Sequence, residues 1–373
     1  MALMAAGCGT SGPGGRDAPV TPSTQVTPST QATPITPVTP ADPAASARPP
    51  GPAEPARPIP VTALPGWRAD DLRGVERALA RQCALRAPPA PWPRLCEEAT
   101  QLQGDRLKDW VQRRFVARPV TGADGAADGL ITGYHEPTLT GSRTRRHDGQ
   151  EPIYRRPSPE VLARRPTRAE LEGDRPLAGS ELAWIDDPVD AFFLHIQGSG
   201  RIRLPDGALL RVGFAADNGQ PYTAIGATLR ARGALPEAEL NAGTIKAWLR
   251  AHPDQARAVM QTNARFIFFR ELPAGAPDDG PPGSLNVPLT PGRSIAVDPR
   301  FVSRGALLWM ATTHPRDGAP LQRLVLAQDT GAAITGAVRA DLFWGDGPDA
   351  ETYAGLMKQR GRLWLLVPSE TGN

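Results

Sequence analysis

The chain has 373 residues, of which 42 are proline, roughly twice the average share. Its 42 basic and 39 acidic residues leave a formal charge of +3, far from the clustered positive charge that is typical of a nucleic-acid-binding protein. The prolines are dense within residues 18–60, and the rest of the chain is still proline-rich. Because proline interrupts helices, this composition excludes an all-α protein, a coiled coil and a protein with several membrane spans.

The N-terminal segment has the pattern of an anchored tether. Cys8 follows small residues, as in the cleavage site of a bacterial lipoprotein, but the charged and apolar segments of a full signal peptide do not precede it. A chance match in an Ala-rich stretch is the alternative. Residues 9–17 are rich in Gly and Ser, and a Thr-Pro series follows, which keeps a chain extended. We expect a signal remnant over 1–8, a lipid on Cys8 and a disordered linker over 9–64.

Cys83 and Cys96 flank a proline-stiffened segment between two predicted helices. In an exported protein these two cysteines would form a disulfide, and two buried free thiols are the alternative. The five histidines do not have the spacing of metal ligands, so we expect no metal site and no cofactor.

Hydrophobic periodicity predicts helices over 71–85 and 96–115, with Asp105 as an N-cap in the second. Apolar residues at helical spacing also predict a helical interlude over 222–252. From residue 116 onward, short apolar runs separated by Gly, Pro and Asp are typical of strands. These runs are 130–134, 191–197, 265–269, 306–310, 323–327 and 362–367. The expected class is mostly β, with peripheral helices at the N-terminal side.

Ser199 lies in a Gly-Ser-Gly sequence after the apolar run 191–197. A nucleophilic serine needs a base within reach, and His195 precedes it in the same predicted strand. No acid is placed to orient that imidazole. The sequence therefore favours a serine in a turn or in contact with a sugar over a nucleophile.

Three aspartates lie beside predicted strands, namely Asp298, Asp329 and Asp341. A strand can hold a carboxylate rigidly in a half-buried setting, where burial raises its pKa towards the range of a general acid and a second carboxylate adds to the effect. Aspartates at strand ends are also common turn residues, so the spacing alone leaves both readings open.

Several segments, in the right order, resemble the membrane-bound lytic murein transglycosylase A (MltA) family. They are residues 132–137, 184–200, 218–226, 287–294 and 327–345, within a resemblance that covers about 65–367. The last segment carries the so-called 3D domain, named for three aspartates that Asp298, Asp329 and Asp341 match. The chain departs from the family pattern at Thr335, where lysine is common, and at His135, which replaces a tyrosine.

The resemblance implies a double-psi β-barrel interrupted by a second, smaller β domain, with a groove for a glycan strand between them. Residues 65–138 and 263–368 would form the barrel, with the 3D domain at about 285–368. Residues 139–262 would form the inserted domain, which supplies the other wall of the groove.

The resemblance also implies the roles of individual residues. Asp341 matches the single acid/base, and Asp329 matches a neighbouring carboxylate that supports it. The residues that it implies for substrate binding are Thr132, Tyr134, Gln197, Ser199 and Asp298.

The implied enzyme is a peptidoglycan exotransglycosylase, a non-hydrolytic lyase. It would cleave the β-1,4 bond between N-acetylmuramic acid and N-acetylglucosamine and form 1,6-anhydro-muramic acid ends. Its partners would be peptidoglycan glycan strands and, through a lipid anchor, the periplasmic face of a Gram-negative outer membrane. We expect a monomer that binds no nucleic acid, with a wall-synthesis complex left open. An inverting glycoside hydrolase and a non-catalytic peptidoglycan-binding module are the alternatives.

Overall fold

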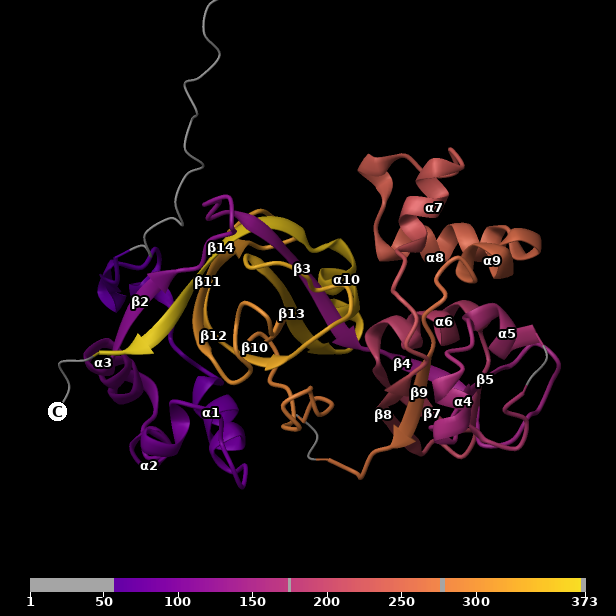
Figure 1. Cartoon of the computed structure of the whole chain (residues 1–373), viewed down its shortest axis with the longest axis horizontal. Helices are drawn as coiled ribbons and strands as arrows, with labels where there is room; N and C mark the ends of the chain where they lie inside the picture. Colours follow the sequence, from indigo (N-terminus) through magenta and orange to yellow (C-terminus); the bar gives the residue numbers. More distant parts are fainter. Residues whose placement is uncertain (1–56, 174–175, 276–278, 370–373) are drawn as a thin grey trace, which may run out of the picture. The chain divides into compact units, whose positions relative to one another are not determined.

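The computed structural model describes residues 57–173, 176–275 and 279–369, and its strands form two sheets (Figure 1). The first sheet has the order β1-β2-β14-β11-β12-β10-β13-β3, and β14 also pairs with β3. Its strands are β1 (Ile59–Pro60), β2 (Phe115–Pro119), β3 (Gly129–Glu136), β10 (Ser294–Val297), β11 (Leu307–Thr313), β12 (Pro320–Asp329), β13 (Arg339–Asp346) and β14 (Lys358–Pro368).

The second sheet lies between β3 and β10 in the sequence and has the order β5-β6-β4-β7-β8-β9. Its strands are β4 (Thr138–Ser142), β5 (Glu151–Tyr154), β6 (Glu181–Ile185), β7 (Ser199–Arg203), β8 (Leu209–Asp217) and β9 (Ile267–Glu271). The prediction of a mostly β chain is confirmed.

Short helices accompany both sheets in the described residues. The α-helices are α1 (Val75–Cys83), α2 (Cys96–Ala99), α3 (Gly104–Arg114), α4 (Pro159–Ala163), α5 (Arg168–Gly173), α6 (Pro188–Gln197), α7 (Ile225–Ala231), α8 (Ala242–Ala251), α9 (Pro253–Met260) and α10 (Pro348–Leu356). The 3₁₀ helices are η1 (Val61–Ala63), η2 (Trp67–Ala69), η3 (Trp92–Arg94) and η4 (Glu237–Glu239). Within the described part of the chain, none of these helices has the length and apolar character needed to span a membrane.

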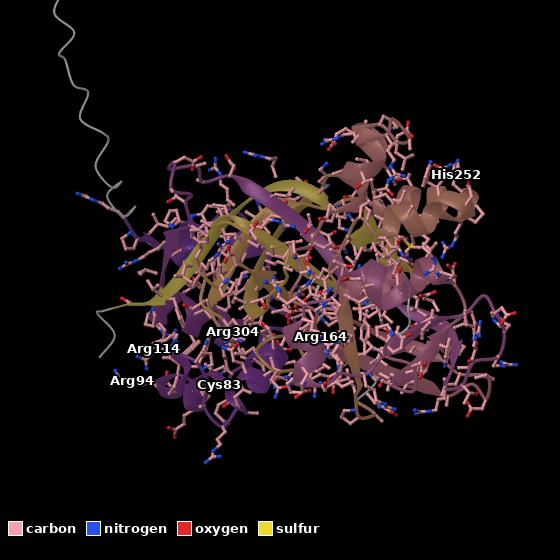
Figure 2. The ribbon with its side chains drawn as sticks, turned by 45° about the vertical axis from the view of Figure 1, so that its right-hand side comes forward. Cys83, Arg94, Arg114, Arg164, His252 and Arg304 are labelled. Carbon is pink, nitrogen blue, oxygen red and sulfur yellow. A yellow bond between two sulfur atoms is a disulfide. The ribbon has the colours of Figure 1, made fainter. Side chains whose placement is uncertain are left out.

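The helices α1 to α3 share a core with the first sheet. Leu79 of α1 and Val111 of α3 belong to the same buried cluster as Trp309 of β11. Trp67 also packs in this cluster, with its ring centroid 5.2 Å from that of Trp309. Cys83 and Cys96 form a disulfide that joins the end of α1 to the start of α2 (Figure 2). The disulfide is therefore confirmed over the alternative of two free thiols.

The two predicted N-terminal helices are shorter than the periodicity indicates. Helix α1 begins only at Val75, because Leu72 and Gly74 have positive φ values of 55° and 89°. The predicted helix over 96–115 is divided into α2 and α3, and its last residue already belongs to β2. The N-cap prediction for Asp105 is wrong: it lies in the first turn of α3, where a carboxylate favours the helix dipole.

The stretch 191–197 forms most of helix α6, so the predicted strand is wrong. The side chain of Asp187 accepts hydrogen bonds from the N–H groups of the two residues that follow Pro188, and Gly198 ends the helix with φ 78°. These are standard start and stop signals. Six of the ten residues of α6 are buried and none is exposed, so the run shows no polar face that would indicate a helical period.

The helical interlude predicted over 222–252 contains α7 and α8. The helical region continues past its predicted end. His252 ends α8, and α9 begins at the next residue, Pro253 (Figure 2).

Two predicted domain boundaries change. The linker predicted to extend to residue 64 ends earlier, because β1 pairs with β2 and both Val61 and Leu64 are buried. Strand β9 was expected with the segment 263–368 but pairs with β8 in the second sheet. Cys8 and most of the predicted linker lie outside the described residues.

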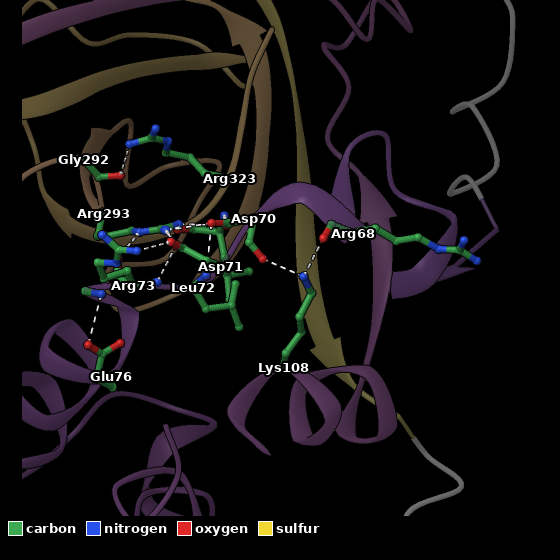
Figure 3. Close-up of polar contacts among 12 residues, drawn as sticks. Arg68, Asp70, Asp71, Leu72, Arg73, Glu76, Lys108, Gly292, Arg293 and Arg323 are labelled. Atoms are coloured by element: carbon green, nitrogen blue, oxygen red, sulfur yellow. Dashed lines mark hydrogen bonds and ion pairs between the residues drawn. The ribbon is translucent and has the colours of Figure 1, made fainter. Parts of the chain in front are cut away.

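A buried ion pair attaches the segment before α1 to the first sheet. Both carboxylate oxygens of Asp70 accept hydrogen bonds from Arg293, at 2.7 and 2.8 Å, and one also accepts from the N–H of Leu324 (Figure 3). Lys108 of α3 donates to the carbonyl oxygen of Asp70, at 2.6 Å. Removing one partner of such a pair costs about 3–5 kcal/mol. This contact therefore holds β10 and β12 against the N-terminal helices.

Candidate active site

Four residues from four neighbouring strands form one row across the first sheet. Asp329 at the end of β12 lies opposite Ala296 of β10, Ala296 lies opposite Asp341 of β13, and Asp341 lies opposite Thr132 of β3. Residues that lie opposite each other on neighbouring strands point to the same face. The two carboxylates therefore share a face, with only a methyl group between them. At about 4.8 Å per strand, their main chains are about 10 Å apart.

Asp341 is held by one short hydrogen bond. The Thr132 hydroxyl donates to Oδ1 of Asp341 at 2.6 Å. Burial raises the pKa of Asp341 to about 6, while the Thr132 bond and the charge of Arg339 lower it and the charge of Asp329 raises it. This carboxyl group can therefore be protonated or ionised near neutral pH.

Asp329 accepts hydrogen bonds from three residues. The N–H groups of Ser284 and Thr330 donate to Oδ1, each at 2.8 Å, and the Tyr134 hydroxyl donates to Oδ2 at 2.9 Å. Burial raises the pKa of Asp329, and these bonds lower it. The Ser284 bond depends on a close approach of the chain, since a Cβ at Gly283 would lie 2.5 Å from a main-chain oxygen of β12.

Two tyrosines lie close to the carboxylates. Tyr134 is two residues after Thr132 on β3, and its ring lies 5.3 Å from that of Phe343 on β13, between centroids. Burial and the charge of Asp329 raise the pKa of Tyr134 well above its usual value. Burial and the charge of Asp341 likewise raise the pKa of Tyr222. Both phenols are neutral hydrogen-bonding groups near neutral pH.

Comparison with known proteins identifies the family. The model of the MltA specific insert domain matches residues 130–270, and the model of the 3D domain matches residues 293–367. Membrane-bound lytic murein transglycosylase A of Escherichia coli K12 is 32% identical over 254 residues, which are 66% of this chain and 67% of that protein. The chain belongs to the MltA family.

Solved structures of MltA-type enzymes have the same fold. The lytic transglycosylase LtgG of Burkholderia pseudomallei is 46% identical, with a TM-score of 0.60 over 84% of this chain and 95% of that one. Escherichia coli MltA with bound chitohexaose is 25% identical, with a TM-score of 0.71 over 85% of this chain and 95% of that one.

Of the residues that the sequence predicts for the MltA site, four are in direct contact. Thr132 bonds to Asp341, and Tyr134 bonds to Asp329. Gln197 contacts β3, the strand of Thr132 and Tyr134, because its Oε1 accepts a hydrogen bond from the N–H of His135, at 3.2 Å.

Ser199, a predicted substrate contact, and His195, weighed as its possible base, lie in different surroundings. Ser199 is buried at the start of β7, and His195 is a core residue of α6 whose Nδ1 accepts a hydrogen bond from the N–H of Ile267. Burial lowers the pKa of His195 well below its usual value, so it stays neutral. This arrangement agrees with a non-nucleophilic Ser199. Contact of Ser199 or Gln197 with a sugar stays a prediction.

Asp298 is bonded away from the other two aspartates. Its carboxylate is 3% exposed and forms an ion pair with Arg300 at 2.6 Å, while Oδ2 also accepts from the N–H of Gly336 at 2.8 Å. The Arg300 side chain holds the pKa of Asp298 well below its usual range. These bonds hold the carboxylate in place, and a contact of Asp298 with substrate stays a prediction.

The two departures from the MltA pattern lie in different surroundings. Thr335 is exposed, whereas the ring of His135 is buried and its two nitrogens have no hydrogen-bond partner among the described residues. Burial lowers the pKa of His135 to about 4, so the ring is neutral near neutral pH. The described residues also contain no group of three or more His, Cys, Asp or Glu side chains that could hold a metal ion.

Arg339 is the site residue that the sequence reasoning missed. It lies two residues before Asp341 on β13, so both side chains point to the same face, and its Nη1 donates to the Thr132 hydroxyl at 2.9 Å. The two-residue period of a strand around Asp341 could have indicated it.

Proposed function

We propose that this chain is a lytic murein transglycosylase. It would cleave the β-1,4 bond between N-acetylmuramic acid and N-acetylglucosamine in peptidoglycan and leave a 1,6-anhydro-muramic acid end. The observation that carries the proposal is a half-buried carboxyl group, Asp341, whose pKa burial raises to about 6, in a row with a second carboxylate. Membership of the MltA family and the chitohexaose bound to an Escherichia coli relative support a glycan as the substrate.

In the proposed mechanism, one carboxyl group acts twice. Protonated Asp341 donates its proton to the glycosidic oxygen while the bond from C1 to that oxygen breaks through an oxocarbenium-like transition state. N-acetylglucosamine leaves with the new hydroxyl group. The Asp341 carboxylate then takes the proton of the C6 hydroxyl of the same muramic acid as the C6 oxygen bonds to C1. The nucleophile is intramolecular, so no water is consumed and Asp341 ends protonated again.

Asp329 would support both steps as an anion. Its hydrogen bonds favour the carboxylate form. Its negative charge would stabilise the positive charge that develops on the sugar and raises the pKa of Asp341. Thr132 would fix the orientation of the acid. Tyr134, Gln197 and Ser199 are proposed to line the substrate groove.

We also propose the finer fold and the location of the enzyme. Because β14 pairs with both β11 and β3, six strands of the first sheet can close into the double-psi barrel expected of the family. The second sheet with its helices would be the inserted domain and the other wall of the groove. A lipid on Cys8 would anchor the enzyme at the periplasmic face of the outer membrane, consistent with relatives named as membrane-bound.

Digestion of purified murein sacculi tests the activity. The full chain and the variant Asp341→Asn are incubated with sacculi, and the released muropeptides are measured by mass spectrometry. The expected products are one water lighter than those of a hydrolase, and the variant releases them at least about 100-fold more slowly, since a general acid contributes that much or more. Circular dichroism serves as the control for the folding of the variant.

Each alternative has a distinct outcome in the same experiment. Muropeptides with a reducing muramic acid would indicate an inverting hydrolase. Binding to sacculi without soluble fragments would indicate a non-catalytic module. Full activity of Asp341→Asn would remove Asp341 from the mechanism. The length of the glycan strands left behind separates attack at chain ends from attack within chains.

A further inference from the structure

A second side chain reaches the Thr132 hydroxyl from the strand that carries Asp341. Nη1 of Arg339 donates to Thr132 Oγ1 at 2.9 Å and to the carbonyl oxygen of Ala340 at 2.6 Å, and it lies 3.4 Å from the carbonyl oxygen of Leu130. These contacts hold the guanidinium group between β3 and β13. No ion pair joins Arg339 to Asp341 among the described contacts, and Thr132 lies between them.

The direction of the Thr132 hydrogen follows from the number of donors. A guanidinium group can only donate, and a threonine hydroxyl has a single hydrogen. Thr132 Oγ1 therefore accepts from Arg339, and its own hydrogen is free to point at Oδ1 of Asp341, 2.6 Å away. An oxygen that carries the acid proton is the weaker acceptor of the two, so while Thr132 donates to Oδ1 the acid proton of Asp341 is favoured on Oδ2.

We propose that Arg339 is a positioning residue: it fixes the direction of the Thr132 hydroxyl and thereby keeps the transferable proton of Asp341 on Oδ2. This inference rests on the proposed acid/base role of Asp341. The proton that leaves Oδ2 goes to the glycosidic oxygen, and the proton of the C6 hydroxyl returns to Oδ2. Thr132 keeps its hydrogen throughout, and Arg339 neither gains nor loses one.

The indirect contact also keeps Asp341 protonatable. A guanidinium group in direct contact with a carboxylate strongly favours the charged form, which would remove the acid. Behind Thr132, Arg339 lowers the pKa of Asp341 less than burial raises it. The other titratable groups near Asp341 are Asp329, Tyr134 and Tyr222, with Lys358 opposite Thr132 on β14.

The test compares kcat and KM for sacculus digestion as a function of pH in the full chain and in two variants, Arg339→Met and Arg339→Lys. We expect Arg339→Met to lower kcat about 10- to 100-fold with little change in KM, the range expected for one charge-assisted hydrogen bond. The loss of activity at high pH should move to higher pH, because the charge that lowers the pKa of Asp341 is gone. Arg339→Lys keeps a charged donor and should recover part of the rate.

The matched control is Arg362→Met, which removes an exposed arginine paired with Asp128 on the same sheet. It should keep the rate and the pH profile of the parent chain. A fall in rate for Arg339→Met without any shift in pH dependence, and without recovery in Arg339→Lys, would reduce Arg339 to a structural residue and overturn the inference.

A double-mutant cycle tests the route through Thr132. If Arg339 acts through this hydroxyl, Arg339→Met should lower kcat much less in a Thr132→Val background than in the parent chain. Fully additive effects would contradict the inference. Asp341→Asn separates the two proposals: if it stays active, the proposed function fails, whereas an inactive Asp341→Asn with a parent-like Arg339→Met refutes only the role of Arg339.

Discussion

Asp298 and Asp341 each have an arginine two residues away on the chain, yet they have opposite electrostatic surroundings. Arg300 forms an ion pair with Asp298 at 2.6 Å and holds its pKa well below the usual range. Arg339 reaches Asp341 only through the Thr132 hydroxyl, and burial raises the pKa of Asp341 to about 6. The first aspartate is a permanent anion that fixes a turn. The second can gain and lose a proton near neutral pH.

The difference shows how a neutral hydroxyl between two charges changes the chemistry of a carboxyl group. A charge in contact stabilises the ionised form strongly, whereas one hydrogen bond from a neutral donor does so weakly. The distance along the sequence is the same in both cases. The outcomes differ because Arg300 and main-chain N–H groups bond directly to Asp298, whereas burial has the largest effect on the pKa of Asp341. Three variants test this difference, and each alters one of the two aspartates or the residue that bonds to it.

The largest effect is expected when the hydroxyl is replaced by a cation. Thr132→Lys would place an ammonium group against Asp341, as Arg300 lies against Asp298, and would lower the pKa of Asp341. We expect sacculus digestion at pH 7 to fall at least about 100-fold, the share of a general acid, and to recover partly at lower pH. Thr132→Ser keeps the hydroxyl and serves as the control. Parent-like activity of a folded Thr132→Lys would contradict the comparison.

Asp298→Asn should destabilise the protein by about 1–3 kcal/mol at neutral pH, because it weakens the bonds to Arg300 and to the N–H of Gly336. The folded-state pKa of Asp298 is lowered, so its stabilising effect is present above the unfolded pKa, near 4, and is lost as the pH falls further. Urea unfolding at pH 7 and at pH 3 measures the difference, which should shrink at pH 3. Equal stability of variant and parent at pH 7 would show that these bonds contribute nothing.

Asp341→Asn should have the opposite effect on stability. The folded-state pKa of Asp341 is raised to about 6, so its ionised form opposes folding above pH 6 and no longer does so below about pH 4. The variant should therefore be more stable than the parent at pH 8, by up to about 3 kcal/mol, and about equally stable at pH 4. Thermal melting at both values measures this. A variant that is less stable at pH 8 would mean that burial does not penalise this carboxylate.

The sequence could predict which residues belong to the candidate site, but not the order of the strands that brings them together. Asp341, Asp329, Thr132 and Tyr134 lie within short segments that resemble the family, and the structure brings them into contact. Their order across the sheet depends on β10 lying between β12 and β13, with β3 beyond. These pairings join segments that are distant in the sequence, and local patterns carry no information on them. The two-residue period around Asp341 could have indicated Arg339, but its contact with Thr132 depends on the pairing of β13 with β3.

Short apolar runs predicted most strands correctly, but one such run is a helix. The strands near 130–134, 306–310 and 323–327 are confirmed. The run 191–197 forms a helix that begins after Asp187 and Pro188 and ends at Gly198, and none of its side chains is exposed. End signals were therefore more informative than composition at this position.

The ion pair between Asp70 and Arg293 gives the chain a mechanical anchor. A pull on Arg57, the first described residue, would load β1 first, and β1 is joined to β2 through only two paired residues. If β1 peeled away, the force would next act on the buried side chains of Val61, Leu64 and Trp67, and then on Asp70. Asp70 is bonded to Arg293 and to Leu324, and Leu324 belongs to the strand that ends at Asp329. The two paired residues of β1 would therefore give way first, and the buried ion pair would be the next contact to resist the force before it acts on the strand of Asp329.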